Sequence, residues 1–530
     1  MFQQKKEFMS WGVMGDWKRP YKTMDSTFVK QQIRLFFWMV SHGYVYQRYM
    51  PVYWSPSSKT ALAESELEYN TQHKSTSIYV RFPITKTDSL SKKTFGISDI
   101  YLLIWTTTPW SLVANRAVCY NPDSEYCLVK HPSGDYYIVA AEILHKNEEL
   151  KDIFGANPDV KDNKLTGHDL SNFTYKNPLW GDDSNNTISL PIFPASHVTM
   201  QSGTGLVHTA PAHGPEDYLI GLNNELDLSC PVDENGCYDN TAPKNLQGLF
   251  ALEEGNTEIL QMLEKGNNVL SKNVYIHSYP YDWRTKKPVL LRASKQWFMD
   301  TGTLQPKALE ALKNVEIHPK SAANGFQGIL DKRPYWCISR QRVWGVPIPV
   351  FYDLKGSAVI SKEMVNRYLD LIDQYGTDFW WELENKEILD GLNIDTQNLT
   401  KGRDILDVWF DSGITWHNII EPNSCNTLKQ SDVYLEGLDQ FSGWFYSSLL
   451  TSVAVQNVSP YKQLYVHGFT MDEEGKKMSK SLGNVVSPAQ ITHGLALDEN
   501  VGEKQEAQKA GKKKKTPNKS STTYGVDVLR

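Results

Sequence analysis

The chain has 530 residues, of which 40% are hydrophobic and 22% are charged, and its formal net charge is −6. This length and composition are typical of a globular protein with roughly three or four domains. The net charge excludes a global basic field, so nucleic acid would have to be held by local patches. No apolar run is long enough to span a bilayer, and we expect no membrane partner.

Cysteine usage argues against both a disulfide scaffold and a zinc site. Six cysteines in 530 residues are too few for such a scaffold, and none forms a Cys-x-x-Cys pair. We therefore expect reduced thiols in an intracellular compartment and no metal ligands. The cysteines are Cys119, Cys127, Cys230, Cys237, Cys337 and Cys425. The first residues have neither a signal-peptide apolar region nor transit-peptide composition, and are expected to come from the middle of a longer sequence.

The pattern of apolar residues changes along the chain. Residues 26–50 begin with apolar side chains at helical spacing, which predicts a helix ending near Gly43. Pro51 and Pro56 bound an extended segment. From about residue 75 to 270, short β-prone runs separated by Gly, Asn, Asp and Pro predict a compact, strand-rich inserted domain. These runs are 77–82, 100–105, 136–139 and 205–208.

A mixed helix and strand pattern returns after residue 271, and residues 498–523 are polar and rich in lysine. Lys512 to Lys515 are consecutive. Low hydrophobicity with like charge predicts a disordered or solvated insert, with an RNA-contacting basic arm as the alternative.

The run Lys477-Met478-Ser479-Lys480-Ser481, followed by Leu482-Gly483-Asn484, is the most informative short segment. Two lysines flank small polar residues, and a glycine follows. A short basic loop of this kind can close over a triphosphate and neutralise developing charge. The alternative for a lysine pair in a loop is a solvated turn.

Two further segments have residues suited to a small ligand. Asp407 to Gly413 reads DVWFDSG and predicts a strand end that turns into a cleft. Tyr434 to Gln440 reads YLEGLDQ, with Gly443 shortly after. Glycine lets backbone approach a ligand closely, and carboxylate and amide side chains can bind an ammonium group or ribose hydroxyls. Taken singly, each segment could be ordinary packing, and Trp409 a core aromatic.

Together these segments resemble those of the isoleucyl-tRNA synthetases, a branch of the class I aminoacyl-tRNA synthetases. The resemblance also includes residues 336–349, WCISRQRVWGVPIP, and residues 51–69, and it covers nearly the whole chain except the polar tail. The bacterial and organellar branch fits best. Valyl and leucyl enzymes share the KMSKS loop, but the run from Arg340 to Pro349 together with WFDSG favours isoleucine. A valyl enzyme remains the alternative within the family.

The resemblance implies an α/β fold, with an incomplete Rossmann-like catalytic domain that is interrupted by a strand-rich editing domain. We expect the catalytic domain at 1–72 and 271–497 and the editing domain at 73–270. Residues 498–523 would be the polar insert, and 524–530 the start of an anticodon-binding region.

The resemblance also implies roles for residues of a synthetic cleft. Trp409 and Trp444 would shape the isoleucine pocket. Glu436 would contact the aminoacyl-adenylate, together with Gly437, Asp439 and Gln440. Lys480 would contact ATP phosphates, with Lys477 in support. The expected ligands are ATP with Mg²⁺ as its substrate complex, isoleucine and tRNA(Ile), and we expect a monomer.

A second, hydrolytic site is expected because one methylene contributes only about 1–3 kcal/mol to discrimination, a magnitude established on this enzyme family. By resemblance, its residues are Thr106, Thr107, Thr108, Asn115, His208 and Asp217. Asp217 would hold the misacylated amino group, because a carboxylate pairs with an ammonium. His208 would orient the sugar or water, and the threonines would position the ester. The alternatives are a β-strand for the threonines and a structural histidine.

The chain departs from the family pattern at several places. It has no His-x-Gly-His string, and Ala212, Leu438, Phe441 and Ser442 replace the usual residues of their motifs. We therefore expect a fragment that lacks this string and the anticodon-binding domain, and that activates isoleucine poorly. A stand-alone editing hydrolase and a catalytically dead paralogue are the alternatives. A mitochondrial matrix enzyme is expected, with a bacterial cytoplasmic enzyme as the alternative.

Overall fold

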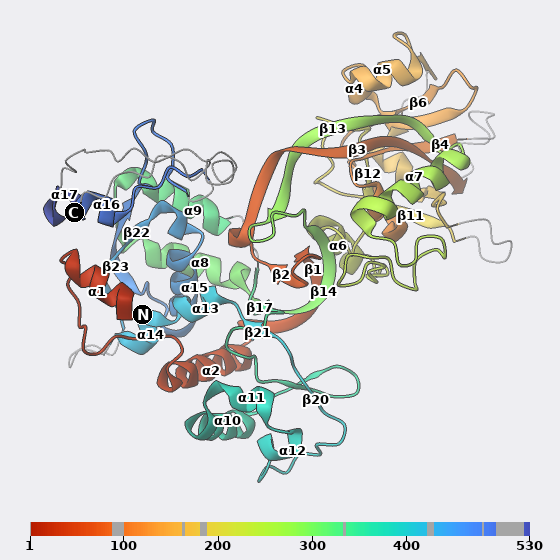
Figure 1. The fold of residues 1–530 in the computed structure, drawn as a ribbon. Coiled ribbons are helices and arrows are strands. Elements are labelled where there is room, and N and C mark those ends of the chain that lie inside the picture. Colours follow the sequence, from red (N-terminus) through yellow and green to blue (C-terminus); the bar gives the residue numbers. More distant parts are fainter. Residues whose placement is uncertain are drawn as a thin grey trace, which may run out of the picture.

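The computed structural model describes residues 2–86, 100–161, 165–180, 188–331, 335–420, 429–479, 482–493 and 524–530. Figure 1 shows two bodies joined by a long two-stranded ribbon. We call residues 67–282 the inserted domain and the remaining described residues the main body. The predicted polar insert at 498–523 lies outside the described residues.

The ribbon consists of β3 (Leu67–Lys86) and β13 (Val269–Asp282), which pair antiparallel. Leu67 lies opposite Asp282 where the ribbon leaves the main body, and Val80 lies opposite Val269 where it joins the larger sheet. The domain boundaries expected from the sequence, after residue 72 and after residue 270, both fall within these two strands.

The inserted domain is built on one large sheet, and its strand-rich character confirms the sequence prediction. Its strand order is β12-β5-β11-β10-β3-β4-β7-β6-β8, with β13 paired to β3 and β9 to β6. The strands are β4 (Ile100–Thr106), β5 (Ala117–Tyr120), β6 (Glu125–Lys130), β7 (Tyr136–Ala140), β8 (Asp159–Val160), β9 (Leu165–Thr166), β10 (Thr174–Tyr175), β11 (Leu190–Pro194) and β12 (Leu206–Thr209). The helices are η2 (Pro109–Ala114), α4 (Ala141–Leu144), α5 (Glu148–Phe154), α6 (Pro215–Asn223) and α7 (Asn256–Lys265).

The main body contains a parallel sheet of β15 (Glu316–His318), β23 (Tyr461–His467) and β22 (Ser431–Gly437), in that order. Helix α15 (Trp444–Gln456) connects β22 to β23, as a parallel pair requires. Ten of the thirteen residues of α15 are buried, including its serines, so it is a core helix. This β-α-β unit confirms the α/β class.

A second sheet connects the main body to the ribbon. Strand β1 (Val45–Ser55) pairs antiparallel with β14 (Leu290–Met299), and the pair curves beneath the ribbon in Figure 1. Helix α2 (Ser26–Ser41) precedes β1, which confirms the helix predicted to end near Gly43. Its buried side chains include Phe28, Ile33 and Phe36, as the helical spacing requires.

The main body contains further short strands and several helices. The strands are β2 (Thr60–Leu62), β16 (Trp336–Cys337), β17 (Ser339–Arg340), β18 (Phe351–Tyr352), β19 (Ala358–Val359), β20 (Thr400–Lys401) and β21 (Ile405–Leu406). The helices are α1 (Phe2–Ser10), η1 (Glu64–Glu66), α8 (Thr301–Leu312), α9 (Ala323–Asp331), α10 (Lys362–Tyr375), α11 (Phe379–Glu382), α12 (Asn385–Ile388), α13 (Val408–Gly413), α14 (Thr415–Ile419), α16 (Pro488–His493) and α17 (Val526–Leu529).

The WFDSG segment differs from the polar turn expected after a strand. Strand β21 ends at Leu406, and residues 408–413 form helix α13. Asp407 causes the difference, because its Oδ1 accepts a hydrogen bond from the backbone N–H of Trp409 at 3.1 Å and caps the helix.

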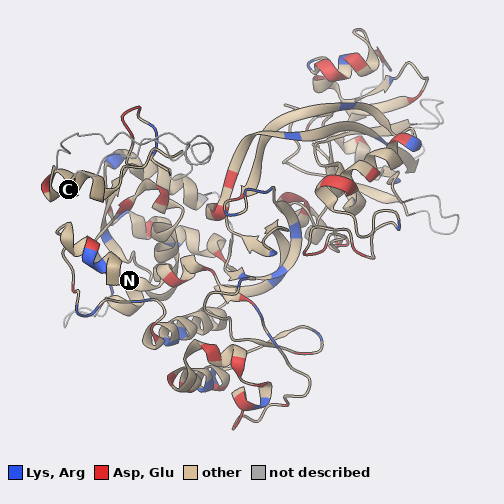
Figure 2. Cartoon of the chain, in the orientation of Figure 1, with Lys and Arg blue, Asp and Glu red and all other residues tan. Residues whose placement is uncertain are grey.

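Charge is distributed over both bodies. Figure 2 shows that the positions of acidic and basic residues are interspersed along the cartoon of the main body and of the inserted domain. Among the described residues, no helix is long and apolar enough to cross a membrane. The five cysteines within the described ranges are free thiols, and Cys425 lies outside those ranges.

Candidate functional site

The carboxyl ends of β22 and β23 meet at one edge of the parallel sheet. Glu436 lies opposite Val466 and Gly437 opposite His467 in the strand register. The YLEGLDQ turn therefore begins beside the segment that leads to the KMSKS loop. In open α/β sheets, ligands bind at this edge.

Trp409 packs directly over a glycine at this edge. A Cβ atom added to Gly443 would lie 2.7 Å from two carbon atoms of the Trp409 ring, closer than any side chain can approach. Glycine is therefore required at position 443 to let the indole lie against the backbone. The Trp409 side chain remains half-buried and borders open space.

Trp444 lies behind this contact and is held on three sides. Its ring stacks on Tyr434, with centroids 4.0 Å apart and planes 9° apart. Its Nε1 donates to the carbonyl oxygen of Ser412 at 3.0 Å, and its backbone N–H donates to Gln440 Oε1 at 3.1 Å. Trp444 does not line the adjoining cavity, so its contacts position the wall that Trp409 forms.

The polar residues of the YLEGLDQ turn differ in their freedom to bind a ligand. Glu436 and Asp439 are exposed. Gln440 is committed on both sides, because its Oε1 accepts from Trp444 and its Nε2 donates to Asp439 Oδ2 at 3.2 Å. The geometry leaves Glu436 as the freer carboxylate at the strand end.

The KMSKS loop is described up to Ser479 and again from Leu482, so Lys480 lies outside the described residues. Asn484 organises the loop: its Oδ1 accepts from the Ser479 N–H at 2.9 Å, and its Nδ2 donates to Asp472 Oδ2 at 2.7 Å. The Lys477 ammonium lies 3.5 Å from the centre of the Phe469 ring. This contact holds the first lysine of the loop against an aromatic face.

One cavity of about 580 Å³ adjoins Trp409. Its walls come from the main body and, in the inserted domain, from Tyr69 of β3 and the first turn of α6, immediately before Asp217. The lining residues are Pro51, Val52, Tyr53, Leu62, Ala63, Glu64, Ser65, Tyr69, Pro215, Glu216, Leu291, Ile329, Tyr335, Trp336, Cys337, Trp409, Ser442, Gly443, Tyr446 and Ser447.

Within the inserted domain, two of the three predicted threonines, Thr106 and Thr108, belong to one hydrogen-bond network with the predicted asparagine and histidine. The Thr108 hydroxyl lies 3.3 Å from the Thr106 hydroxyl and 3.1 Å from the Ser111 hydroxyl. Ser111 Oγ lies 2.9 Å from His208 Nε2. Asn115 Nδ2 lies 3.0 Å from His208 Nδ1. The sequence prediction missed Ser111, which lies between the threonines and the histidine.

The donors and acceptors in this hydrogen-bond network fix the tautomer of His208. Asn115 Oδ1 accepts from the Tyr175 hydroxyl at 2.7 Å, and Asn115 Nδ2 donates to the Ala117 carbonyl at 2.8 Å. The amide nitrogen therefore faces His208, and Nδ1 of the ring must be the acceptor. Nε2 then carries the proton and donates to Ser111, whose own hydroxyl donates to the Thr108 carbonyl at 2.9 Å.

His208 is consequently a neutral, oriented ring. Burial, and then the nearby His213, lower the pKa of His208 to about 3. Both ring nitrogens already have hydrogen-bond partners, so the ring holds the hydrogen-bond network in place and is not free to exchange a proton with a ligand.

Asp217 lies in the first turn of α6 and faces the loop that follows His208. Its Oδ2 accepts from the backbone N–H of Ala210 at 2.8 Å. Burial raises the pKa of Asp217 to about 7; the hydrogen bond from Ala210 opposes this, and Glu216 adds to it. A cationic group bound beside it would favour the ionised carboxylate.

The sequence prediction missed two residues of the hydrogen-bond network, Ser111 and Tyr175, and only the first of them had a signal in the sequence. Pro109 opens a short helical turn, which brings Ser111 back over Thr108, so Ser111 had a recognisable signal. Tyr175 lies in the two-residue strand β10 outside any motif, and no sequence pattern indicates its role. Thr107 forms no side-chain hydrogen bond within the described residues, so its hydroxyl is available to a ligand.

No group of three or more His, Cys, Asp or Glu side chains that could hold a metal ion occurs in the described part of the chain. The exposed carboxylates at the strand end fit only a metal ion that arrives with its own phosphate ligands.

Comparison with known proteins identifies relatives along the whole chain. A profile of the tRNA synthetases class I (I, L, M and V) matches residues 1–530. The mitochondrial isoleucine–tRNA ligase of Macaca fascicularis is 45% identical over 538 residues, which cover 100% of this chain and 51% of the relative. The mitochondrial enzyme of Gallus gallus is 46% identical over 504 residues, covering 93% and 49%. The isoleucine–tRNA ligase of Prochlorococcus marinus (strain MIT 9211) is 42% identical over 546 residues, covering 99% and 53%.

The chain thus spans about half the length of the curated relatives it matches. The match to the family profile over all 530 residues agrees with the β-α-β unit of the main body and with the strand-rich insertion. The chain belongs to the class I tRNA synthetases of the isoleucine, leucine, methionine and valine group.

Proposed function

We propose that this chain carries the amino-acid cleft and the editing domain of an isoleucine–tRNA ligase. In this reaction, isoleucine and ATP, bound with Mg²⁺, form isoleucyl-adenylate with release of pyrophosphate, and the isoleucyl group then passes to tRNA(Ile) with release of AMP. Valyl-tRNA(Ile) formed in error is hydrolysed in the inserted domain.

The contact between Trp409 and Gly443 carries the proposal for the cleft. It forms an apolar wall of a cavity at the ligand-binding edge of the parallel strands. A branched aliphatic side chain fits against an indole wall, and Glu436 at the end of β22 is an exposed carboxylate for the polar part of the adenylate. The KMSKS loop begins from the neighbouring strand, where its lysines can follow the phosphates.

Attack of a carboxylate on the α-phosphate needs positioning and charge neutralisation more than a covalent catalyst. Lys477 and Lys480 supply positive charge for this step. The proposed role of Lys480 depends on the motif alone, because this residue lies outside the described ranges.

For editing, the inserted domain offers a row of hydroxyls and a buried carboxylate. Asp217 is proposed to hold the α-ammonium of the valyl ester. The hydroxyls of Thr106, Thr107 and Thr108 position the ester and the attacking water. His208 keeps that row of hydroxyls in register through Ser111.

Two measurements on the full chain test the proposal. The chain is expected to bind a sulfamoyl analogue of isoleucyl-adenylate more tightly than the valyl analogue, and to hydrolyse Val-tRNA(Ile) faster than Ile-tRNA(Ile). Equal affinity for the two analogues would contradict the assignment of the cleft. Equal hydrolysis of the two esters would contradict the assignment of the editing site.

A stand-alone editing hydrolase is the second candidate. It is favoured by one observation: the hydrogen-bonded chain from Thr106 to Tyr175 and the carboxylate of Asp217 all lie within the inserted domain. Hydrolysis of Val-tRNA(Ile) without measurable binding of either analogue would support this candidate.

Replacing Tyr175 by phenylalanine is expected to slow the hydrolysis of Val-tRNA(Ile) about tenfold at an unchanged KM. The buried Asn115 Oδ1 would lose its donor, which costs about 1–3 kcal/mol, and the amide could rotate away from His208. Ring ¹⁵N shifts should then show a mixture of His208 tautomers in place of the single Nε2–H form.

Tyr126→Phe is the matched control. Tyr126 is also a fully buried tyrosine of the inserted domain, but its hydroxyl donates to the Gly205 carbonyl at 2.8 Å and lies outside the hydroxyl chain. A Tyr175→Phe variant with the wild-type rate and a single tautomer would show that Asn115 is oriented without Tyr175.

We further propose a mitochondrial matrix location, since the relatives include mitochondrial enzymes; bacterial relatives leave a bacterial cytoplasm as the alternative. A monomer that binds tRNA(Ile) is the proposed state.

A further inference from the structure

The most unusual feature behind the walls of the cavity is a buried cluster of four charged side chains. Arg340, Glu66 and Asp407 are 0%, 2% and 0% exposed, and Arg342 lies at the margin with a side chain 17% exposed. Two positive and two negative charges balance. Burial raises the pKa of Glu66, but Arg340 and Arg342 outweigh it and hold that pKa below its usual value.

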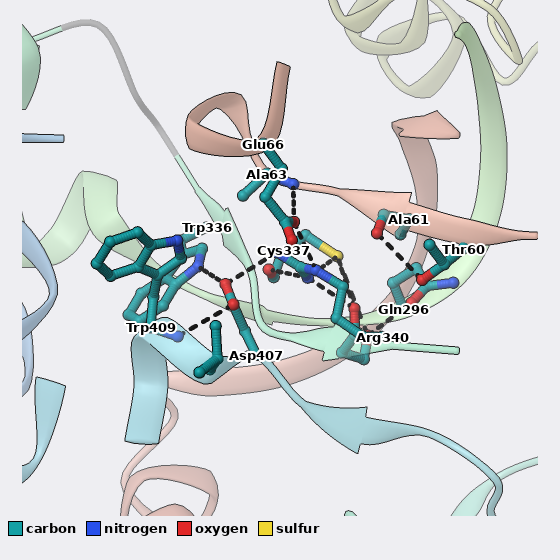
Figure 3. Close-up of polar contacts among 12 residues, drawn as sticks. Thr60, Ala61, Ala63, Glu66, Gln296, Trp336, Cys337, Arg340, Asp407 and Trp409 are labelled. Atoms are coloured by element: carbon teal, nitrogen blue, oxygen red, sulfur yellow. Dashed lines mark hydrogen bonds and ion pairs between the residues drawn. The ribbon is translucent and has the colours of Figure 1, made fainter. Parts of the chain in front are cut away.

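Arg340 makes the connections of this cluster. Its Nε donates to Glu66 Oε2 at 2.9 Å, and its Nη2 donates to Asp407 Oδ2 at 2.8 Å. Its Nη1 donates to the carbonyl oxygens of Cys337 and Ser339, both at 2.8 Å. Figure 3 shows Arg340 between the two carboxylates, with every nitrogen of its guanidinium engaged.

Each partner of Arg340 holds a different wall of the cavity. Asp407 caps α13 through the backbone N–H of Trp409 and accepts from Trp336 Nε1 at 2.9 Å. Glu66 Oε2 accepts from the backbone N–H of Ala63 at 3.0 Å. Trp409, Trp336 and Ala63 line the cavity, whereas Arg340, Glu66 and Asp407 do not.

Stability alone is a weak reason for such a cluster, because burying ions costs about as much as their attraction returns. A guanidinium, however, offers donors in a rigid plane, so it fixes the angle between two carboxylates in a way that a lysine ammonium cannot. The cluster is therefore suited to setting the relative positions of three segments.

We propose that Arg340 is a positioning residue for amino-acid selection, which fixes Trp409 and Trp336 through Asp407, and the segment at Ala63 through Glu66. This inference rests on the proposed function, because it assigns the cavity beside Trp409 to the isoleucine side chain. A pocket distinguishes isoleucine from valine only if its walls are fixed to within the size of one methylene.

The test compares Arg340→Lys with Arg342→Lys in the full chain. Arg342 Nη2 donates to the same carboxylate, at Glu66 Oε1 and 2.8 Å, but forms no hydrogen bond or ion pair with Asp407 among the described residues. Arg340→Lys is expected to reduce the ratio of affinities for the isoleucyl and valyl sulfamoyl analogues about tenfold, by weakening the isoleucyl complex. Arg342→Lys is expected to leave that ratio unchanged.

A second readout needs no ligand. In chain labelled with 5-fluorotryptophan, the ¹⁹F signals of Trp336 and Trp409, assigned by single Trp→Phe variants, are expected to shift in Arg340→Lys and to stay in place in Arg342→Lys. A merely structural role for Arg340 would change the melting temperature and leave both the ratio and these two signals as in the wild type, and that result overturns the inference.

The two proposals can fail separately. A wild-type chain without preference between the analogues contradicts the proposed function, and the ¹⁹F signals still decide the role of Arg340. If Arg340→Lys does not fold, Asp407→Asn replaces it: asparagine keeps the helix cap but faces Trp336 and Arg340 with an amide in place of a carboxylate. The same shifts and the same loss of preference are expected, and their absence overturns the inference.

Discussion

Asp217→Ala is expected to reduce the hydrolysis of Val-tRNA(Ile) by at least roughly 30-fold. Removing one partner of a buried, hydrogen-bonded charge pair costs about 2–5 kcal/mol, and every 1.4 kcal/mol is about a factor of ten. The measurement is single-turnover deacylation, with binding of the isoleucyl analogue as the control for an intact cleft. Hydrolysis at the wild-type rate would remove Asp217 from the site.

The same residue predicts a pH dependence. Because the pKa of Asp217 is raised to about 7, kcat/KM for hydrolysis should rise as the pH passes through about 7 and the carboxylate ionises. Asp217→Asn should remove that rise.

The effect of the raised Asp217 pKa on the stability of the fold has the opposite sign. A folded pKa above the unfolded one contributes stability at low pH that is lost between about pH 4 and 7. Asp217→Asn should therefore resist urea better than the wild type at pH 8.

Asp407→Ala is expected to lower the free energy of unfolding by about 3–5 kcal/mol, because it leaves the buried guanidinium of Arg340 with one carboxylate and removes the cap of α13. Urea unfolding of the purified chain measures the change as a shift of the midpoint at constant slope.

Asp432→Ala provides the contrast. Asp432 also pairs with a cation, Lys462 Nζ at 2.7 Å, but its side chain is 85% exposed. Such a surface pair contributes only about 0–1 kcal/mol. Equal losses in the two variants would show that Arg340 finds a replacement partner or water when Asp407 is removed.

Local features of the sequence predicted much of the fold. Helix α2 and the strands β3, β4, β7 and β12 of the insertion follow from spacing and from turn residues within a few positions. The motifs also indicated Asn115 and His208, which the structure brings within 3.0 Å of one another. Asn115 and His208 lie in segments far apart in the sequence, and only the family resemblance predicted that they belong to one site.

The rest depends on contacts that no short window contains. Arg340 bonds to partners 274 and 67 residues away, and a lone arginine in a polar run is usually a surface residue. Helix α13 forms where a turn was expected, because Asp407 is held in place from outside its own segment. The sequence predicted the same role for Trp409 and Trp444, that of shaping the isoleucine pocket, yet of the two only Trp409 borders the cavity.

The pairing of Leu67 with Asp282 has a consequence for how the two bodies could diverge. The chain leaves and re-enters the main body at adjacent points, so the host fold meets the insertion only as the two sides of a hairpin. Each doubling of a connecting loop costs only about 0.6 kcal/mol. Material can therefore be gained or lost beyond the hairpin without separating β1 from β14, and the proposed editing activity can change while the host sheet stays the same.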